Sequence, residues 1–197
     1  MSIKLNGSTS GSVELDVPAA VSGGDIALTL PTSVGSAGQY LRNSSTAGTL
    51  EFATFGGPAF RAERSSSQSI TTSVNVKVQF DSETFDTDSD YDNTTNYRFT
   101  PSKAGYYSVT ASLFVNWSVS QFSTALVKLY KNGSEYSRAS HLTAAASADY
   151  GTIIHTDLVY MNGSTDYAEV YIFTNAGGPT VDGGADNSFF AAHWVHG

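Results

Sequence analysis

The fold is decided by one long alternating stretch of sequence, Tyr106-Tyr107-Ser108-Val109-Thr110-Ala111-Ser112-Leu113-Phe114-Val115-Asn116-Trp117. Its odd-numbered residues are all apolar, whereas its even-numbered residues are mostly Ser, Thr and Asn. Successive side chains of a β-strand point to opposite faces, so this period of two predicts a long strand with one face in a core. Tyr106 and Phe114 interrupt the polar face, and we therefore expect that something covers that face as well.

Shorter alternating segments lie on both sides of this strand. They are residues 74–80, 125–129, 154–160, 168–173 and 189–195. Asn132-Gly133 predicts a two-residue hairpin, because both residues tolerate the positive φ of a type I′ turn, and Asn162-Gly163 predicts a second one. No helical period of useful length is present. The pattern predicts an all-β chain that folds as a jelly-roll β-sandwich of two antiparallel sheets.

Residues 1–55 differ in composition from residues 56–197. They are rich in Gly, Ser and Thr and contain only short apolar runs. A segment of this kind buries too little surface to offset its own ordering entropy. We expect an irregular or short-stranded N-terminal arm at 1–55, which is either a flexible tail or a set of short strands ordered only against other chains. The head is expected at 56–197.

The charge of the chain excludes several classes of partner. Charged residues make up 14% of the sequence, and the formal net charge is −8. This balance argues against nucleic acid and against anionic membrane surfaces, both of which need clustered Lys and Arg. There is no cysteine, which excludes disulfides and thiolate metal sites. The start of the sequence has no leader-like apolar run, and no segment is long enough for membrane insertion, so no secretory route is expected.

From about residue 58 to residue 195, the order of motifs resembles the complement one-q globular head, a member of the tumour-necrosis-factor-like jelly rolls. The sharpest match is Asn96-Tyr97-Arg98-Phe99-Thr100-Pro101 followed by Ala104-Gly105-Tyr106-Tyr107. Leu129-Tyr130-Lys131-Asn132-Gly133 resembles a hairpin of the family. Ser188-Phe189-Phe190-Ala191 stands where the family has Ser-x-Phe-Ser-Gly, so Ala191-Ala192 departs from the pattern. The resemblance implies a homotrimer.

Outward-facing aromatic side chains support the same expectation independently, because a lone soluble domain rarely exposes so many. The residues expected at the trimer interface are Tyr106, Phe114, Tyr167, Tyr171, Phe173 and Phe190.

The arm resembles a second kind of protein. Ile26-Ala27-Leu28-Thr29-Leu30-Pro31, then Gly35-Ser36-Ala37-Gly38-Gln39-Tyr40-Leu41, then Thr46-Ala47-Gly48-Thr49-Leu50-Glu51-Phe52 form a recurring type of string. It is similar to strings in tail fibres and other appendages of bacteriophages. This similarity implies that the arm contacts other virion proteins and that the chain is located in the virion.

The densest group of charges lies between residues 81 and 92. Its alternating carboxylates Asp86, Asp88, Asp90 and Asp92 could gather hard oxygen ligands around calcium. The helix-loop-helix calcium pattern is not met, because Tyr91 stands where glycine is required. Two interpretations remain open, a calcium site and a solvated acidic loop. No other cofactor is expected.

No enzymatic activity is expected, because no Gly-x-Ser-x-Gly elbow or comparable frame holds the Ser, His and Asp residues. Binding is expected on loops far from the arm, at 118–122, 144–151 and 177–187, because loops vary without disturbing a sandwich. The candidate ligand-binding residues are Ser118, Ser120, Gln121, Tyr150, Asp182 and Asn187.

Three functions follow from this organisation. In the first, a phage fibre or receptor-binding appendage docks on the virion through its arm and binds a host cell-surface glycan or protein through its trimeric head. In the second, the chain is a structural decoration or neck protein of the virion without a host ligand. In the third, it is a free secreted or cell-surface lectin-like module, which the expected lack of a secretory route disfavours.

Overall fold

The computed structural model describes residues 3–6, 12–15, 28–54, 56–117, 124–141, 150–184 and 186–197. The chain divides into two compact units, Met1–Phe55 and Gly56–Gly197, at the point where the composition of the sequence changes. Every regular element within the described ranges is a strand, and none of those ranges holds a helix that is long and apolar enough to cross a membrane.

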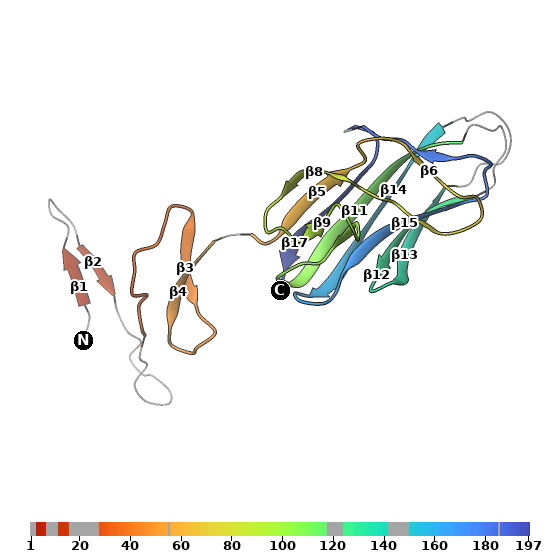
Figure 1. Ribbon diagram of the computed structural model, residues 1–197. Coiled ribbons are helices and arrows are strands. Elements are labelled where there is room, and N and C mark those ends of the chain that lie inside the picture. Colours follow the sequence, from red (N-terminus) through yellow and green to blue (C-terminus); the bar gives the residue numbers. More distant parts are fainter. Residues whose placement is uncertain are drawn as a thin grey trace. The chain divides into compact units, whose positions relative to one another are not determined.

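The head consists of two packed antiparallel sheets (Figure 1). The first has the order β13 (Ser134–His141), β12 (Ala125–Lys131), β15 (Ala168–Thr174), β10 (Arg98–Phe99) and β9 (Tyr91–Asp92), with β7 (Val76–Lys77) paired to β15. The second has the order β6 (Gln68–Ser69), β16 (Thr180–Val181), β11 (Ala104–Asn116), β17 (Phe189–His196), β5 (Ala59–Glu63) and β8 (Ser82–Asp86), with β14 (Tyr150–Asn162) paired to β11. The predicted all-β sandwich is confirmed.

The described residues of the N-terminal unit form two strand pairs. They are β1 (Ile3–Asn6) with β2 (Ser12–Leu15), and β3 (Gln39–Asn43) with β4 (Leu50–Thr54).

The long predicted strand is β11, which pairs with β14 along its whole length and with β17 on its other side. Its odd-numbered residues from Tyr107 to Val115 are all buried, as the alternation predicts. β11 therefore lies one strand in from the edge strand β14, and its buried row forms a large share of the core.

One of the two predicted hairpins is present. Asn132 and Gly133 have φ values of 52° and 76° and connect β12 to β13. The prediction at Asn162-Gly163 is wrong, because β14 pairs with β11 in one sheet whereas β15 pairs with β12 in the other. The side-chain oxygen of Asn162 instead accepts hydrogen bonds from the amides of the next loop residues, which guides the chain from one sheet to the other.

The alternating segment 74–80 forms a much shorter strand than predicted, β7, of only two residues. Beyond it the amide of Val78 still donates to the Val170 carbonyl of β15, and side chains take over from Gln79. The amide of Gln79 donates to the side-chain oxygen of Gln68, and the Gln79 carbonyl accepts from the guanidinium of the buried Arg64. Val78 and Phe80 point into the core as the alternation predicts, whereas Val74 of the same predicted face is 46% exposed.

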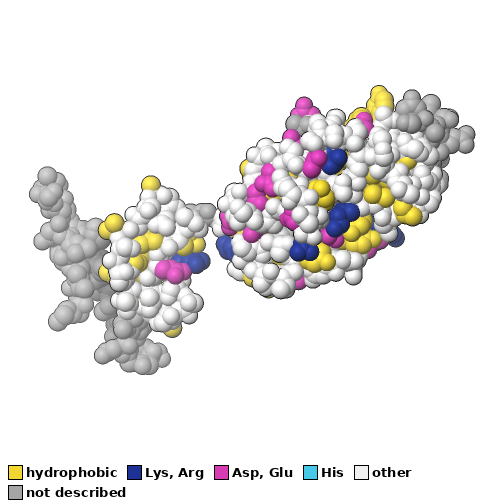
Figure 2. All heavy atoms as spheres, viewed as in Figure 1, with side chains coloured by type: hydrophobic (Ala, Val, Ile, Leu, Met, Phe, Trp, Pro, Cys, Tyr) yellow, Lys and Arg dark blue, Asp and Glu magenta, His cyan; other side chains and the backbone are white. Residues whose placement is uncertain are grey.

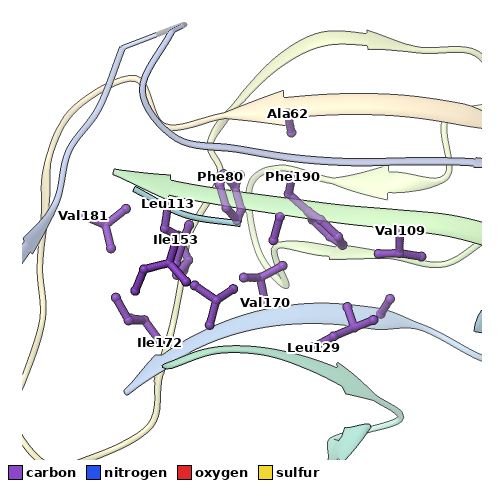
Figure 3. Close-up of a cluster of buried hydrophobic side chains, with 14 of the residues drawn as sticks. Ala62, Phe80, Val109, Leu113, Leu129, Ile153, Val170, Ile172, Val181 and Phe190 are labelled. Carbon is purple, nitrogen blue, oxygen red and sulfur yellow. The ribbon is translucent and has the colours of Figure 1, made fainter. Parts of the chain in front are cut away.

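An aromatic cluster fills the core between the sheets at one end of the sandwich. The ring of Phe60 stacks on Tyr91 and on Phe99, with 4.6 Å between centroids in both cases, and meets Phe190 edge-on at 4.9 Å. Figure 3 shows Phe190 and Phe80 pointing into the space between the layers. Phe190 is 0% exposed, so its predicted place at the trimer interface is wrong. In β17 it is Phe189 and Ala191 that lie on the opposite face.

Candidate functional site

The outer face of β14 is a row of exposed, mainly apolar side chains. Ile153, Val159 and Met161 are buried, whereas the even-numbered residues of β14 point away from the core. Ile154 is 60% exposed and Tyr150 63%, unusually large values for residues within a regular strand. The exposed row comprises Tyr150, Thr152, Ile154, Thr156, Leu158 and Tyr160.

The outer face of β11 continues this row, because each of its outward residues lies directly opposite one of β14. These pairs are Tyr106 with Tyr160, Ser108 with Leu158, Thr110 with Thr156, Ser112 with Ile154, Phe114 with Thr152 and Asn116 with Tyr150. We call these twelve residues the β11–β14 face.

Aromatic contacts close both ends of the β11–β14 face. Tyr106 meets Tyr160 edge-on, with 5.4 Å between centroids, and also contacts the ring of His196. Phe114 stacks on Tyr150 at 5.6 Å at the other end. Between them, the hydroxyls of Thr110 and Thr156 lie 3.0 Å apart. These contacts fix the side chains into a flat surface without removing their apolar area from water.

The β11–β14 face carries no charged residue. The neighbouring strand β17 adds Phe189, Ala191 and His193. Charged side chains follow on β5, where Arg61 and Glu63 pair at 2.7 Å, and on β8, where Glu83 is exposed. Six of the twelve residues of this face are aromatic or aliphatic and the other six are uncharged Ser, Thr or Asn, a composition suited to burial against protein.

His155 on the inner side of β14 ties this strand to the other sheet. Its Nε2 atom lies 2.8 Å from the Ser137 hydroxyl of β13. Burial lowers the pKa of His155, against an opposing effect of Asp157, and this favours the neutral ring at neutral pH. The inner side of β14 therefore places no imidazolium charge behind the apolar face.

The six aromatic residues predicted for the trimer interface do not form one surface. Tyr106 and Phe114 lie in the β11–β14 face, and Phe190 lies in the core. Tyr171 and Phe173 lie on β15 in the opposite sheet, preceded by Tyr167.

Cations of the same chain cover these three residues of the opposite sheet. Arg98 lies 4.4 Å from the ring centroid of Tyr167, Lys77 5.8 Å from that of Tyr171, and Lys128 5.7 Å from that of Phe173. Lys77 and Lys128 also pair with Glu169 and Glu135. This sheet surface therefore covers its aromatic groups within one chain. On the β11–β14 face a cation also lies near one ring, since Lys131 is 5.9 Å from the ring centroid of Tyr160.

The predicted calcium site is not supported by the geometry. No group of three or more His, Cys, Asp or Glu side chains in the described parts of the chain is arranged to hold a metal ion. Asp86 accepts from the amide of Tyr91, Asp90 from the amide and hydroxyl of Ser102, and Asp92 from the amides of Thr94 and Thr95. The carboxylates cap loop backbone, so their oxygens turn away from a shared centre. Asp88, whose amide donates to Asp86, adds no convergent oxygen.

The cap made by Asp92 gives a testable stability prediction. Asp92→Ala is expected to lower the melting temperature of the head by about 2–4 °C, which corresponds to about 1 kcal/mol, because the amides of Thr94 and Thr95 lose their acceptor. Asp92→Asn should cost less, since its amide oxygen still accepts. Thermal unfolding followed by circular dichroism measures both variants, and equal losses would contradict the capping role.

The same cap has a defined pH dependence. Hydrogen bonds from Thr95 and Thr94 hold the pKa of Asp92 well below its usual range. The stabilisation is therefore complete above the ordinary aspartate pKa of about 4 and is lost as the pH falls through the lower folded value. In Asp92→Asn this part of the acid dependence should disappear.

The predicted ligand-binding residues are only partly within the described chain. Ser118, Ser120 and Gln121 lie outside the described residues. Tyr150 begins β14 and is largely exposed. Asp182 accepts from the hydroxyl of Thr180, and the Asn187 side chain donates to the Gly183 carbonyl.

Tyr150 and Asp182 lie at the same end of the head. Tyr150 pairs with Asn116 at the end of β11, and the amide of Asp182 donates to the carbonyl of Phe114. The chain enters the head at the other end of β11, where Gly57 packs against Trp194 and Trp194 donates to the Ala104 carbonyl. Tyr150 and Asp182 therefore lie at the end of the sandwich opposite the point at which the chain enters it.

Comparison with solved structures agrees with this architecture. The chain matches the Eiger TNF of S. frugiperda at 9% identity with a TM-score of 0.51, over 71% of this chain and 93% of that one. The head is similar in fold to tumour necrosis factors. The jelly roll expected from the sequence resemblance is thereby confirmed, and identity this low shows the fold of the head alone.

Two further structures resemble the head. The globular domain of a zebrafish complement 1qA protein matches at 13% identity and a TM-score of 0.49, over 71% of this chain and 98% of that one. The PRD1 vertex protein P5 matches at 13% identity and a TM-score of 0.49, over 72% of this chain and 99% of that one. No protein-family model and no curated protein matches the sequence.

Proposed function

We propose that the protein is a non-enzymatic appendage of a bacteriophage virion, in which the arm docks on the particle and a trimeric head binds a host surface ligand. The exposed β11–β14 face is the observation that supports a trimer. It presents Ile154, Leu158 and an aromatic pair at each end to solvent in a single chain, and none of its twelve residues is charged. Contact with two further copies removes this area from water.

The arm supports the location on a virion. Its string of Leu-Pro, Gly-x-x-Gly-Gln-x-Leu and Gly-x-Leu-x-Phe between residues 30 and 52 is similar to strings in phage fibres and appendages. A short unit joined to a trimeric head fits attachment by one end and recognition by the other. The test is electron microscopy of the particle that carries this chain, with gold-labelled antibody against the head. Label at the tips of fibres is expected, and label on the capsid surface or neck would favour the structural alternative.

Host recognition is proposed for the end of the head that carries Tyr150 and Asp182. Three copies around an axis present three such ends, so weak single contacts to a glycan or protein add up through avidity. Purified protein is expected to bind host cells. Replacing loop 118–122, 144–149 or 177–187 by a Gly/Ser linker, which keeps Tyr150 of the β11–β14 face, should weaken that binding by at least about tenfold for at least one loop. Undiminished binding by all three variants would contradict this location, and no binding by the unaltered protein would favour a decoration or neck role.

A further inference from the structure

Residues 28–54 of the arm form an ordered backbone frame of their own. Strands β3 and β4 pair in register from Gln39 with Thr54 to Asn43 with Leu50. A third segment joins them, because the amide of Thr29 donates to the Gly48 carbonyl and the amide of Leu50 donates to the Thr29 carbonyl. The frame therefore uses its backbone hydrogen bonds as a small sheet does, rather than as a random tail.

The glycine at position 35 shows that this frame is specific. A Cβ atom at Gly35 would lie 2.6 Å from the Phe52 ring, so only glycine allows the backbone to contact the ring there. The turn that follows is closed by Gln39, whose side-chain oxygen accepts from the Ser36 amide and whose own amide donates to the Ser36 carbonyl. The Gly-x-x-Gly-Gln part of the string thus builds one face of the frame.

The frame nevertheless has no core in a single chain, because none of the residues from 28 to 54 is buried. Val34 is 94% exposed, and Leu28, Leu30, Leu41 and Phe52 are exposed as well. Leu30, Val34 and Phe52 belong to the lining of an open hollow of about 550 Å³. Figure 2 shows hydrophobic side chains at the surface of this unit.

A frame with paired backbone and no buried side chain lacks the main driving force for folding. An isolated two-stranded hairpin is marginal in water, and burial of apolar area is what offsets its ordering entropy. The exposed leucines, Val34 and Phe52 are the side chains whose burial would supply that force.

We propose that residues 28–54 are a second self-association module, in which the hollow and the exposed apolar side chains around Val34 pack against the same residues of the other copies. This inference rests on the proposed trimer, because the head holds three arms at high effective concentration. The charges favour a second copy as the occupant. Arg42 and Glu51 are the only charged residues of the module, and they pair at 2.8 Å, so identical modules meet without net repulsion.

The experiment uses single cysteines in the full-length chain, which has none of its own. V34C replaces a residue of the proposed contact, and S45C is the matched control in the exposed turn between β3 and β4. Both sites are exposed in a single chain, so a charged maleimide should label both thiols at similar rates if the modules do not pack together. Packing between copies should slow V34C relative to S45C by at least about tenfold, equivalent to about 1.4 kcal/mol.

Two further measurements test whether slow labelling of V34C comes from packing between copies. In the full-length chain that also carries Leu158→Asp, which is expected to separate the heads, the two labelling rates should become similar. In the unaltered protein, the amides of β3 and β4 should be protected from hydrogen exchange, whereas Leu158→Asp should remove that protection.

Failure of this inference and failure of the trimer give different results. A trimeric protein in which V34C is labelled as fast as S45C would overturn the self-association module while leaving the trimer intact. A monomeric unaltered protein would overturn the trimer and the module together.

Discussion

Replacing Leu158 by Asp is expected to dissociate the head into single chains. Leu158 lies in the middle of the β11–β14 face, opposite Ser108, and is 49% exposed in one chain. In the proposed trimer this position is enclosed, so an unpaired carboxylate there is expected to cost about 3–5 kcal/mol, or more than about 100-fold in affinity for each contact. Light scattering at micromolar concentration should therefore report the mass of one chain.

The matched control for this variant is Val74→Asp. The exposed fraction of Val74, 46%, is close to the 49% of Leu158, but Val74 precedes β7 of the opposite sheet. The control should keep the mass of a trimer, and both variants should retain the circular dichroism of a β-sandwich. If Leu158→Asp also remains trimeric, the β11–β14 face is not the contact between copies.

Replacing Phe190 by Ala is expected to destabilise the head by about 3–5 kcal/mol, because the deleted ring leaves a cavity in the aromatic cluster. Phe190 is fully buried and contacts the rings of Phe60, Phe80 and Tyr91. Urea unfolding measured at one fixed protein concentration gives the change in free energy of unfolding.

Phe85→Ala is the control for this loss. Phe85 has the same side chain on β8, but it is 48% exposed, so its removal should cost less than about 1 kcal/mol. A similar loss in both variants would contradict the assignment of Phe190 to the core.

The sequence predicted β11 and the Asn132-Gly133 hairpin well because both signals are local. In β11 one of the two alternating rows is wholly apolar, and in the hairpin the turn residues themselves are diagnostic. The odd-numbered residues of β11 are apolar, whereas four of its seven even-numbered residues are Ser, Thr or Asn, so the odd face is the one suited to a core. Strand β17 is different. Phe189-Phe190-Ala191-Ala192 is apolar in both phases, so alternation could not tell whether Phe189 or Phe190 faces inward. The register with β11 and β5 decides it.

The β14 half of the β11–β14 face was not predicted, because the polarity of β14 favours the wrong row as its buried one. In β14 the inward row mixes Ile153, Val159 and Met161 with His155 and Asp157, while the outward row is the more uniformly apolar one. A reading by polarity assigns the outward row to the core. Only the pairing with β11 shows that Ile154 and Leu158 lie next to Ser112 and Ser108 on the solvent side.

Asn162-Gly163 failed as a hairpin signal because positive φ is equally useful in a loop that crosses between sheets. Gly163 has a φ of 72°, as a hairpin would need, yet the strands on its two sides belong to different sheets. Local turn chemistry fixes the conformation of a loop, whereas the pairing of distant strands fixes where the loop leads.

The β11–β14 face is expected to be buried between copies of this chain, and the mass of the unaltered protein in solution tests this burial. Sedimentation equilibrium at micromolar concentration should give three times the 20.8 kDa of one chain, with no loss of mass on moderate dilution. A mass of one chain under these conditions would show that the β11–β14 face is not buried between copies.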